Sequence, residues 1–134
     1  MGPVFAQDTP TLQVAKTPTC GCCSAWVERM QDAGFVTEVQ DVEQEALWTM
    51  KDRLGITQEL SGCHTAVVSD YFVEGHVPAA DIQRMLAEAP AARGLAVPGM
   101  PMGSPGMGAM GTGDPFDVLL VLNDGSTQVF ASYA

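Results

Sequence analysis

The chain has 134 residues, of which 46% are hydrophobic, and this is enough to build one domain with a core of its own. Sixteen acidic residues against six basic ones give a net charge of −10, a balance that repels nucleic acid and anionic membrane surfaces and argues against both as partners. No run of the sequence approaches the roughly 20 apolar residues that a membrane-spanning helix needs, so we expect no membrane span.

The N-terminal end predicts little structure. Residues 1–10 are expected to form a disordered stub, with residues 11–134 as a single domain. Residues 1–7 lack the basic region and the long apolar run of a complete signal peptide. Val4-Phe5-Ala6 fits the remainder of a cleaved signal peptide, and a remnant of cloning fits it about as well.

The first predicted unit is a strand, a cysteine-rich loop and a helix. Residues 12–15 favour a short strand. After the loop, apolar side chains recur at helical spacing until Gly34 provides a natural stop: Cys23, Trp26, Val27 and Met30. We therefore expect the cysteines at a strand-to-helix junction.

Three of the four cysteines form the motif Cys20-Gly21-Cys22-Cys23. Its outer pair has the CxxC spacing of redox sites, and Cys22 adds a third thiol between them. The free N–H groups and the dipole of a helix N-terminus lower the pKa of such thiols and favour the thiolate, which binds metals and attacks disulfides. Two structural disulfides are the alternative, with three possible connectivities. Small disulfide scaffolds are usually richer in cysteine, and a bridge between adjacent Cys22 and Cys23 would close a strained ring.

A second strand over residues 35–39 and a second helix are expected next. Asp41 is predicted to cap this helix, with Gln44 in the capping-box position three residues later. Gly55 is predicted to end it, and its buried face should consist of Ala46, Leu47, Met50 and Leu54.

Two further strands and a third helix complete the predicted unit. Residues 65–68 and 71–73 favour strands that are joined by a tight turn. Pro78 is predicted to open a helix that Pro90 ends, with Ile82, Met85, Leu86 and Ala89 facing inward. The order βαβ followed by ββα is that of thioredoxin and glutaredoxin, an α/β fold. In that arrangement the loop before the third strand packs against the CxxC motif, which would bring Cys63 to the other three sulfurs.

The C-terminal part contains a methionine-rich loop and a hairpin. Residues 98–113 carry no charged side chain and are rich in Gly and Pro, which predicts an irregular loop. This loop holds Met100, Met102, Met107 and Met110. Thioethers are soft ligands that suit Cu(I), so these methionines are either a second site or relay, or connector residues that fill apolar gaps. Residues 116–133 favour a β-hairpin that would extend the thioredoxin-like βαβ-ββα sandwich.

Four linked motifs support a more specific expectation: TPTCGCC at 17–23, GCHT at 62–65, EGHVP at 74–78 and GLAVPGMP at 94–101. Together they resemble the bacterial CopG-like family of copper-resistance and predicted metal-binding proteins, over roughly residues 11–133. The resemblance implies a thioredoxin-like domain that binds copper through the cysteines. It also implies a periplasmic place in copper resistance and homeostasis, possible contact with other periplasmic copper-handling proteins, and removal of a signal peptide.

The ligand types indicate which metal to expect. Thiolates select Cu(I), Zn(II) or iron–sulfur clusters. Structural zinc sites prefer ligand pairs from two separated knuckles, and the usual iron–sulfur spacings differ from this one. Cu(I) tolerates two- and three-coordinate sulfur and bridging thiolates. Our hypothesis is that Cys20, Cys22, Cys23 and Cys63 share bridging sulfurs around more than one Cu(I) ion.

The two histidines have less certain roles. His64 is a candidate extra metal ligand, a proton acceptor for a thiol, or a strand-start residue whose side chain turns away from Cys63. We favour the last interpretation, because adjacent residues on a strand point to opposite faces. His76 is predicted to lie at the surface or to support a ligand from behind.

The main competing function is enzymatic. In a thiol–disulfide oxidoreductase, Cys20 would be the nucleophile and Cys23 the resolving thiol. Cys22 and Cys63 would then have no role. A hybrid function is also open, in which oxidation of the cysteines releases copper and reduction reloads it, as is a passive copper buffer or chaperone.

Overall fold

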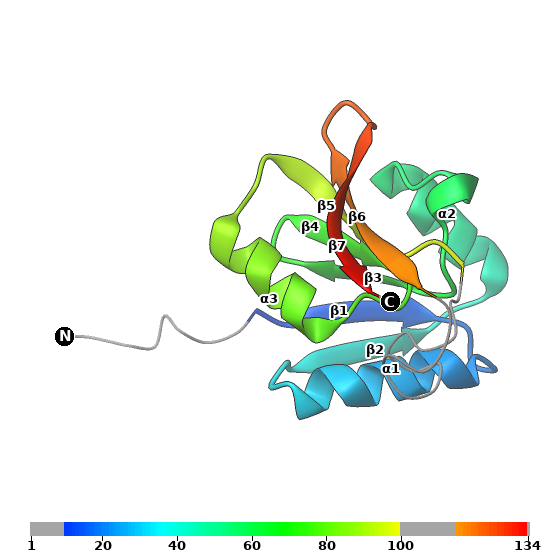
Figure 1. The fold of residues 1–134 in the computed structure, drawn as a ribbon. Helices are drawn as coiled ribbons and strands as arrows, with labels where there is room; N and C mark the ends of the chain where they lie inside the picture. The colour runs from blue at the N-terminus through cyan, green and yellow to red at the C-terminus, as the bar shows by residue number, and fades with distance from the viewer. Residues whose placement is uncertain (1–9, 100–114, 134) are drawn as a thin grey trace.

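The computed structural model describes residues 10–99 and 115–133. Within these ranges a single seven-stranded sheet is flanked by three α-helices and a short 3₁₀ helix (Figure 1). In chain order the elements are β1 (Leu12–Lys16), α1 (Gly21–Asp32), β2 (Thr37–Asp41), α2 (Gln44–Leu54), η2 (Gln58–Leu60), β3 (Thr65–Val68), β4 (Tyr71–Glu74), α3 (Ala79–Glu88), β5 (Ala92–Ala96), β6 (Phe116–Leu122) and β7 (Thr127–Tyr133).

The strands lie in the order β2-β1-β3-β4-β5-β6-β7. β1 is parallel to β2 and antiparallel to β3, which is in turn antiparallel to β4. β5 is parallel to β4 and antiparallel to β6, and β7 closes the far edge as the antiparallel partner of β6. The predicted α/β class, the βαβ-ββα order and the added hairpin are thus confirmed, whereas the likeness to thioredoxin itself stays a prediction.

Both faces of the sheet carry apolar side chains, because successive residues of a strand point to opposite sides. On β4, for example, Val73 packs into one cluster and Phe72 into the other. The larger cluster lies under α1 and α3 and includes Trp26, Met30, Ile82, Met85, Leu95 and Val118. The smaller one joins the sheet to the end of α2 and to η2 through Ile56, Leu60, Ala96 and Val121. The two faces therefore hold separate cores.

β5 is an element that the sequence did not predict. Its residues, Ala-Arg-Gly-Leu-Ala, are short of β-branched side chains, and a glycine usually weakens a strand. The structure requires glycine here, since a Cβ on Gly94 would lie 2.1 Å from the backbone oxygen of Phe72 on β4. Close approach of the two backbones, a tertiary constraint, therefore outweighs local propensity.

The predicted start of α2 was wrong, and its predicted buried face was right only in part: Leu47 is buried, and Met50 and Leu54 are partly buried. Asp41 is the last residue of β2, where its carboxylate pairs with Lys16 Nζ at 2.8 Å, and Glu43 is the N-cap residue. The buried residues of α2 are Leu47 and Lys51, while Ala46 is exposed. The helix thus turns a lysine toward the sheet, which periodicity of apolar residues alone could not indicate.

Smaller boundaries also differ. β2 begins at Thr37, two residues later than expected, and Phe35 is buried ahead of it. Ala89, predicted to face inward, is exposed and caps the C-terminal end of α3 in the left-handed conformation.

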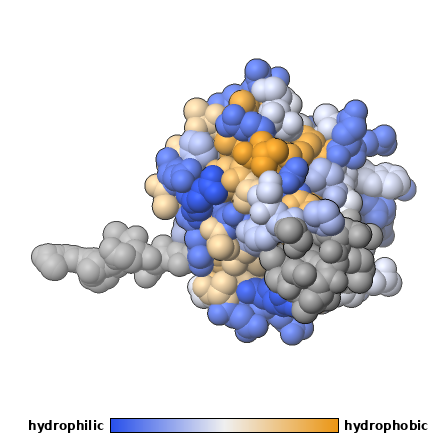
Figure 2. All heavy atoms as spheres, viewed as in Figure 1, coloured by the Kyte–Doolittle hydropathy of each residue, from blue (hydrophilic) through white to orange (hydrophobic). Residues whose placement is uncertain are grey.

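Figure 2 shows a mostly hydrophilic face with an apolar patch over the β6–β7 hairpin. Among the described residues, none of the helices is both long and apolar enough to cross a membrane.

Candidate metal centre

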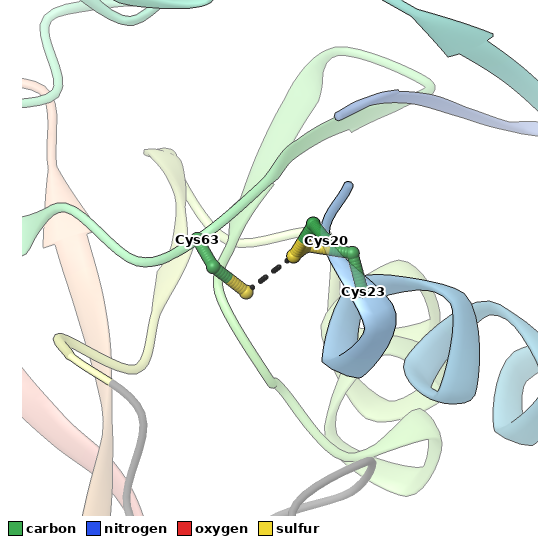
Figure 3. Close-up of side chains that lie close together, drawn as sticks. All are labelled: Cys20, Cys23 and Cys63. Carbon is green, nitrogen blue, oxygen red and sulfur yellow. Dashed lines mark hydrogen bonds between the residues drawn. A yellow bond between two sulfur atoms is a disulfide. The ribbon is translucent and has the colours of Figure 1, made fainter. Parts of the chain in front are cut away.

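Two segments that are distant in sequence bring three cysteines together. Cys20 is the N-cap of α1, and Cys23 lies fully buried in its first turn. Cys63 precedes β3 and is directed toward them (Figure 3). Sγ of Cys63 lies 3.2 Å from Sγ of Cys23, although 40 residues separate the two. The predicted convergence of Cys63 with the CxxC motif is therefore observed.

Cys20 and Cys23 form a disulfide bond in this structure. The outer cysteines of the motif can thus pair with each other, which matches the redox-active spacing noted in the sequence. The side chain of Cys22 lies outside the described residues, and so do Met100, Met102, Met107 and Met110. Their roles remain predictions.

Both histidines lie at Cys63, which contradicts the favoured interpretation of His64 and a surface position for His76, and agrees with the alternative that His76 supports a ligand from behind. Nδ1 of His64 is 3.3 Å and Nε2 of His76 is 2.9 Å from Sγ of Cys63, and both rings are fully buried. His64 precedes β3 rather than lying in it, so the alternation of a strand does not turn it away. His76 follows β4, which pairs with β3, and the hairpin returns it to the same place.

The ring of His64 lies against the rings of Trp26 and His76. The His64 ring lies 4.2 Å from the Trp26 ring and 5.4 Å from the His76 ring, measured between centroids. Trp26 Nε1 donates a hydrogen bond of 2.9 Å to the backbone oxygen of Val77, which fixes the indole against the segment that carries His76. The helix that bears the cysteines is thereby connected to both histidines.

Burial lowers the pKa of the His64 imidazole well below its usual value, and the nearby His76 and the charge of Lys51 lower it further. The His64 ring is therefore neutral at pH 7. A neutral imidazole has a lone pair available for a metal ion or a proton.

A buried ion pair lies behind Cys63. Lys51 on α2 is 6% exposed and Glu74 at the end of β4 is fully buried, and their side chains are in direct contact. The Glu74 carboxylate also accepts hydrogen bonds from the backbone N–H of Gly62 at 2.9 Å and from the Thr65 hydroxyl at 2.6 Å. Lys51 Nζ donates to the backbone oxygen of Gly62 at 3.2 Å. The peptide that precedes Cys63 is thus held on both sides.

The backbone around Gly62 is closely packed as well. A Cβ on Gly62 would lie 2.5 Å from Cα of Gly75, which itself adopts a φ of +77°. The N–H of Gly75 donates to the backbone oxygen of His64 at 3.1 Å. The segment with Cys63 and His64 is therefore fastened directly to the segment with His76.

Two groups of potential ligands share Cys63. One consists of Cys20, Cys23 and Cys63, the other of Cys63, His64 and His76, and the ligand atoms of each group lie within 4.8 Å of one another. Sulfur and imidazole nitrogen are the donors that copper and zinc take. The sequence analysis did not count His76 among the candidate metal ligands, although the EGHVP motif that contains it was one of the four linked motifs.

Comparison with known proteins supports this reading of the site. A family model described as "Protein of unknown function, DUF411" matches residues 60–107, which include Cys63 and both histidines. No curated protein matches the chain. Two solved structures named "Copper resistance protein copG", forms 1 and 2, share 38% and 39% identity with it, each at a TM-score of 0.85. The matches cover 93% and 94% of this chain and 98% and 99% of the two others. The chain therefore belongs to the family of the copper resistance protein CopG.

Proposed function

We propose that the protein binds Cu(I) in copper resistance, through a cluster in which Cys20, Cys22, Cys23 and Cys63 bridge more than one copper ion. The observation that carries the proposal is the 3.2 Å contact between the sulfurs of Cys63 and Cys23. A fold that places a distant thiol against a CxCC motif supplies more sulfur than a dithiol redox site uses. Membership of the CopG family supports copper as the metal.

The donor set fits this cargo. Thiolate sulfur is soft and favours Cu(I), and the described part of the site offers no carboxylate among its grouped ligands. Cys23 is fully buried and Cys20 and Cys63 are partly buried, so bound ions would be largely shielded from water. Such shielding would protect Cu(I) from oxidation and disproportionation.

Binding would be linked to the redox state of the motif. Two electrons and two protons from an external dithiol would convert the Cys20–Cys23 disulfide into two thiols, and loss of their protons would give the thiolates that bind copper. When an external disulfide accepts two electrons from the two thiolates, the Cys20–Cys23 bond forms again, which removes both ligands and would release cluster ions. The structure with the disulfide would accordingly represent the oxidised form.

The setting that we propose is the periplasm, with other periplasmic copper-handling proteins as donors and acceptors of the metal. The Cys20–Cys23 disulfide supports this, because disulfides persist in oxidising compartments.

Copper loading of the reduced protein tests the proposal. The protein is loaded with Cu(I) under anaerobic conditions, and copper per chain is measured by elemental analysis. We expect several copper ions per wild-type chain and fewer in Cys22→Ser and Cys63→Ser. Ser24→Ala, an exposed change next to the motif, serves as the control and should load like the wild type. Saturation at one copper per chain, unchanged by Cys22→Ser, would contradict a four-cysteine cluster.

A thiol–disulfide oxidoreductase is the second candidate. The disulfide at the N-terminus of α1 favours it, because this is where helix N–H groups stabilise a departing thiolate. Cys20 would then act as the nucleophile and Cys23 as the resolving thiol. Reduction of insulin disulfides by the copper-free protein, at a rate that Cys63→Ser leaves unchanged, would favour the enzyme over the copper protein.

A further inference from the structure

Cys63 stands between two ligand groups of different chemistry. Its Sγ lies near the sulfurs of Cys20 and Cys23 at the start of α1, and it also lies near two imidazole nitrogens. The disulfide between Cys20 and Cys23 leaves the second group complete, since Cys63, His64 and His76 take no part in it. The mixed group therefore persists in the state where the cluster has lost two of its ligands.

The distances suit one ion. Zinc, a first-row ion, binds sulfur at roughly 2.3 Å and histidine nitrogen at roughly 2.0 Å. With such bond lengths, the observed sulfur-to-nitrogen separations of 2.9 and 3.3 Å correspond to angles of roughly 85° and 100° at the metal. The three ligand atoms lie within 4.8 Å of one another, so a single ion placed among them would draw Cys63 and both rings together by modest side-chain shifts.

Burial and hydrogen bonding also set His64 apart from a structural histidine. Buried polar atoms in native proteins nearly always have a hydrogen-bond partner. Nε2 of His64 has none among the residues that the structure describes, while Nδ1 of the same ring lies 3.3 Å from Sγ of Cys63. A ring held in the interior by such a contact is placed as a ligand would be.

The surrounding backbone keeps the three side chains together. The N–H of Gly75 binds the backbone oxygen of His64, and Glu74 binds the N–H of Gly62. Each tie joins the segment before β3 to the segment at the end of β4. The ligands thus come from one rigid unit, which is the arrangement that preorganises a metal site.

We propose that Cys63, His64 and His76 hold one copper ion at a mixed sulfur–nitrogen site, which forms without Cys20, Cys22 or Cys23. The inference rests on the proposed copper function and extends it. One thiolate with two imidazoles is the ligand set of trigonal copper sites that accept both Cu(I) and Cu(II). Transfer of two electrons from Cys20 and Cys23 to an external disulfide would then re-form their bond and release the cluster ions, while one copper stays on the protein.

The test uses a variant that keeps the mixed site alone. In Cys20→Ala/Cys22→Ala/Cys23→Ala, Cys63 is the one remaining thiol, because the chain has four cysteines. The tag-free protein is loaded with Cu(I) in the presence of a competing Cu(I) chelator. We expect one copper per chain, and an X-ray absorption spectrum with one sulfur and two imidazoles. The chain has two histidines, so an imidazole signal can come from no other residue.

Further substitutions in this background identify the ligands. His64→Phe keeps a ring against Trp26, and His76→Phe fills the same space. Each should lower copper affinity by more than the roughly 10–100-fold that loss of a supporting residue costs. Ser24→Ala is the control and should leave the affinity unchanged. No bound copper in the triple variant, or copper that neither histidine substitution weakens, would overturn the inference.

Two additional measurements distinguish failure of the mixed-site inference from failure of the proposed four-cysteine cluster. If the triple variant does not fold by circular dichroism, the Cys22→Ser protein with its Cys20–Cys23 disulfide intact takes its place and carries the same expectation. Reduced wild-type protein is loaded in parallel. Several copper ions in the wild type, with none at the isolated mixed site, would refute this inference alone. One copper ion in both the wild type and the triple variant, with loading unchanged in Cys22→Ser, would refute the cluster instead.

Discussion

Replacing Lys51 with methionine tests whether the buried ion pair holds the Cys63 loop in place. The substitution keeps the length and apolar stem of the side chain and removes its charge. It leaves the Glu74 carboxylate fully buried without its cation, although Gly62 and Thr65 still donate hydrogen bonds to it. The backbone oxygen of Gly62 loses its partner at the same time.

The expected cost is large for a chain of this size. Removal of one partner of a buried ion pair destabilises a protein by about 3–5 kcal/mol, because the other charge is left uncompensated. The whole free energy of unfolding of a small domain is about 5–15 kcal/mol. Urea unfolding of the reduced, copper-free protein measures this difference. The double variant Lys51→Met/Glu74→Gln removes both charges and should recover most of the loss.

An exposed ion pair of the same chain provides the control. Arg84 and Glu88 on α3 are 3.2 Å apart and half exposed, so Glu88→Ala should cost less than about 1 kcal/mol. Copper loading of Lys51→Met should also weaken, since Cys63 follows the loosened peptide. A loss of stability no larger than that of Glu88→Ala, with normal copper loading, would refute the argument that this pair positions Cys63.

Three further substitutions test the same account. Gly62→Ala should lower the free energy of unfolding by about 1–3 kcal/mol, because its Cβ would lie 2.5 Å from Cα of Gly75. A Cβ on Gly21 would meet nothing within 4 Å, so Gly21→Ala is the control and should be tolerated. Equal urea midpoints for the two variants would contradict this expectation. Copper-free protein should lose stability as the pH falls below about 6.5, by up to about 1.4 kcal/mol per pH unit, because the lowered pKa keeps His64 neutral in the folded state while the unfolded state takes up the proton. His64→Phe should remove that part of the pH dependence in urea unfolding, and an unchanged slope would argue against it. Tyr133→Phe deletes the 2.6 Å hydrogen bond from the Tyr133 hydroxyl to the buried Asp81 carboxylate on α3, and it should lower the free energy of unfolding by about 1–3 kcal/mol. An unchanged free energy of unfolding would show that this bond contributes nothing.

The parts of the fold that follow local rules could be predicted from the sequence. The stripe from Cys23 to Met30 predicted α1, because the residues at helical spacing are the ones that the helix buries. Short runs of apolar, β-branched and aromatic residues, bounded by turn residues, predicted β3, β4 and the C-terminal hairpin. β5 could not be predicted, since its glycine is required by the backbone of β4 rather than by local propensity. The burial of Lys51 on α2 was missed for a related reason. Lys51 is buried because Glu74, 23 residues away, provides the opposite charge.

The candidate site divides in the same way. The CxCC motif and the approach of Cys63 could be predicted, because the element order fixed which loops meet. The positions of His64 and His76 could not. They depend on where β3 begins and on the β3–β4 register that pairs Thr65 with Glu74, and a shift of one residue would turn each ring elsewhere. The β3–β4 hairpin, once folded, therefore determines where the His64 and His76 rings lie.

X-ray absorption at the copper edge of the reduced, fully loaded wild-type protein tests the central claim most directly. A cluster with bridging cysteine sulfurs predicts a first shell dominated by sulfur and a second shell from neighbouring copper ions, with both reduced in Cys63→Ser. A single shell without copper–copper scattering, at a loading of one ion per chain, would contradict the cluster.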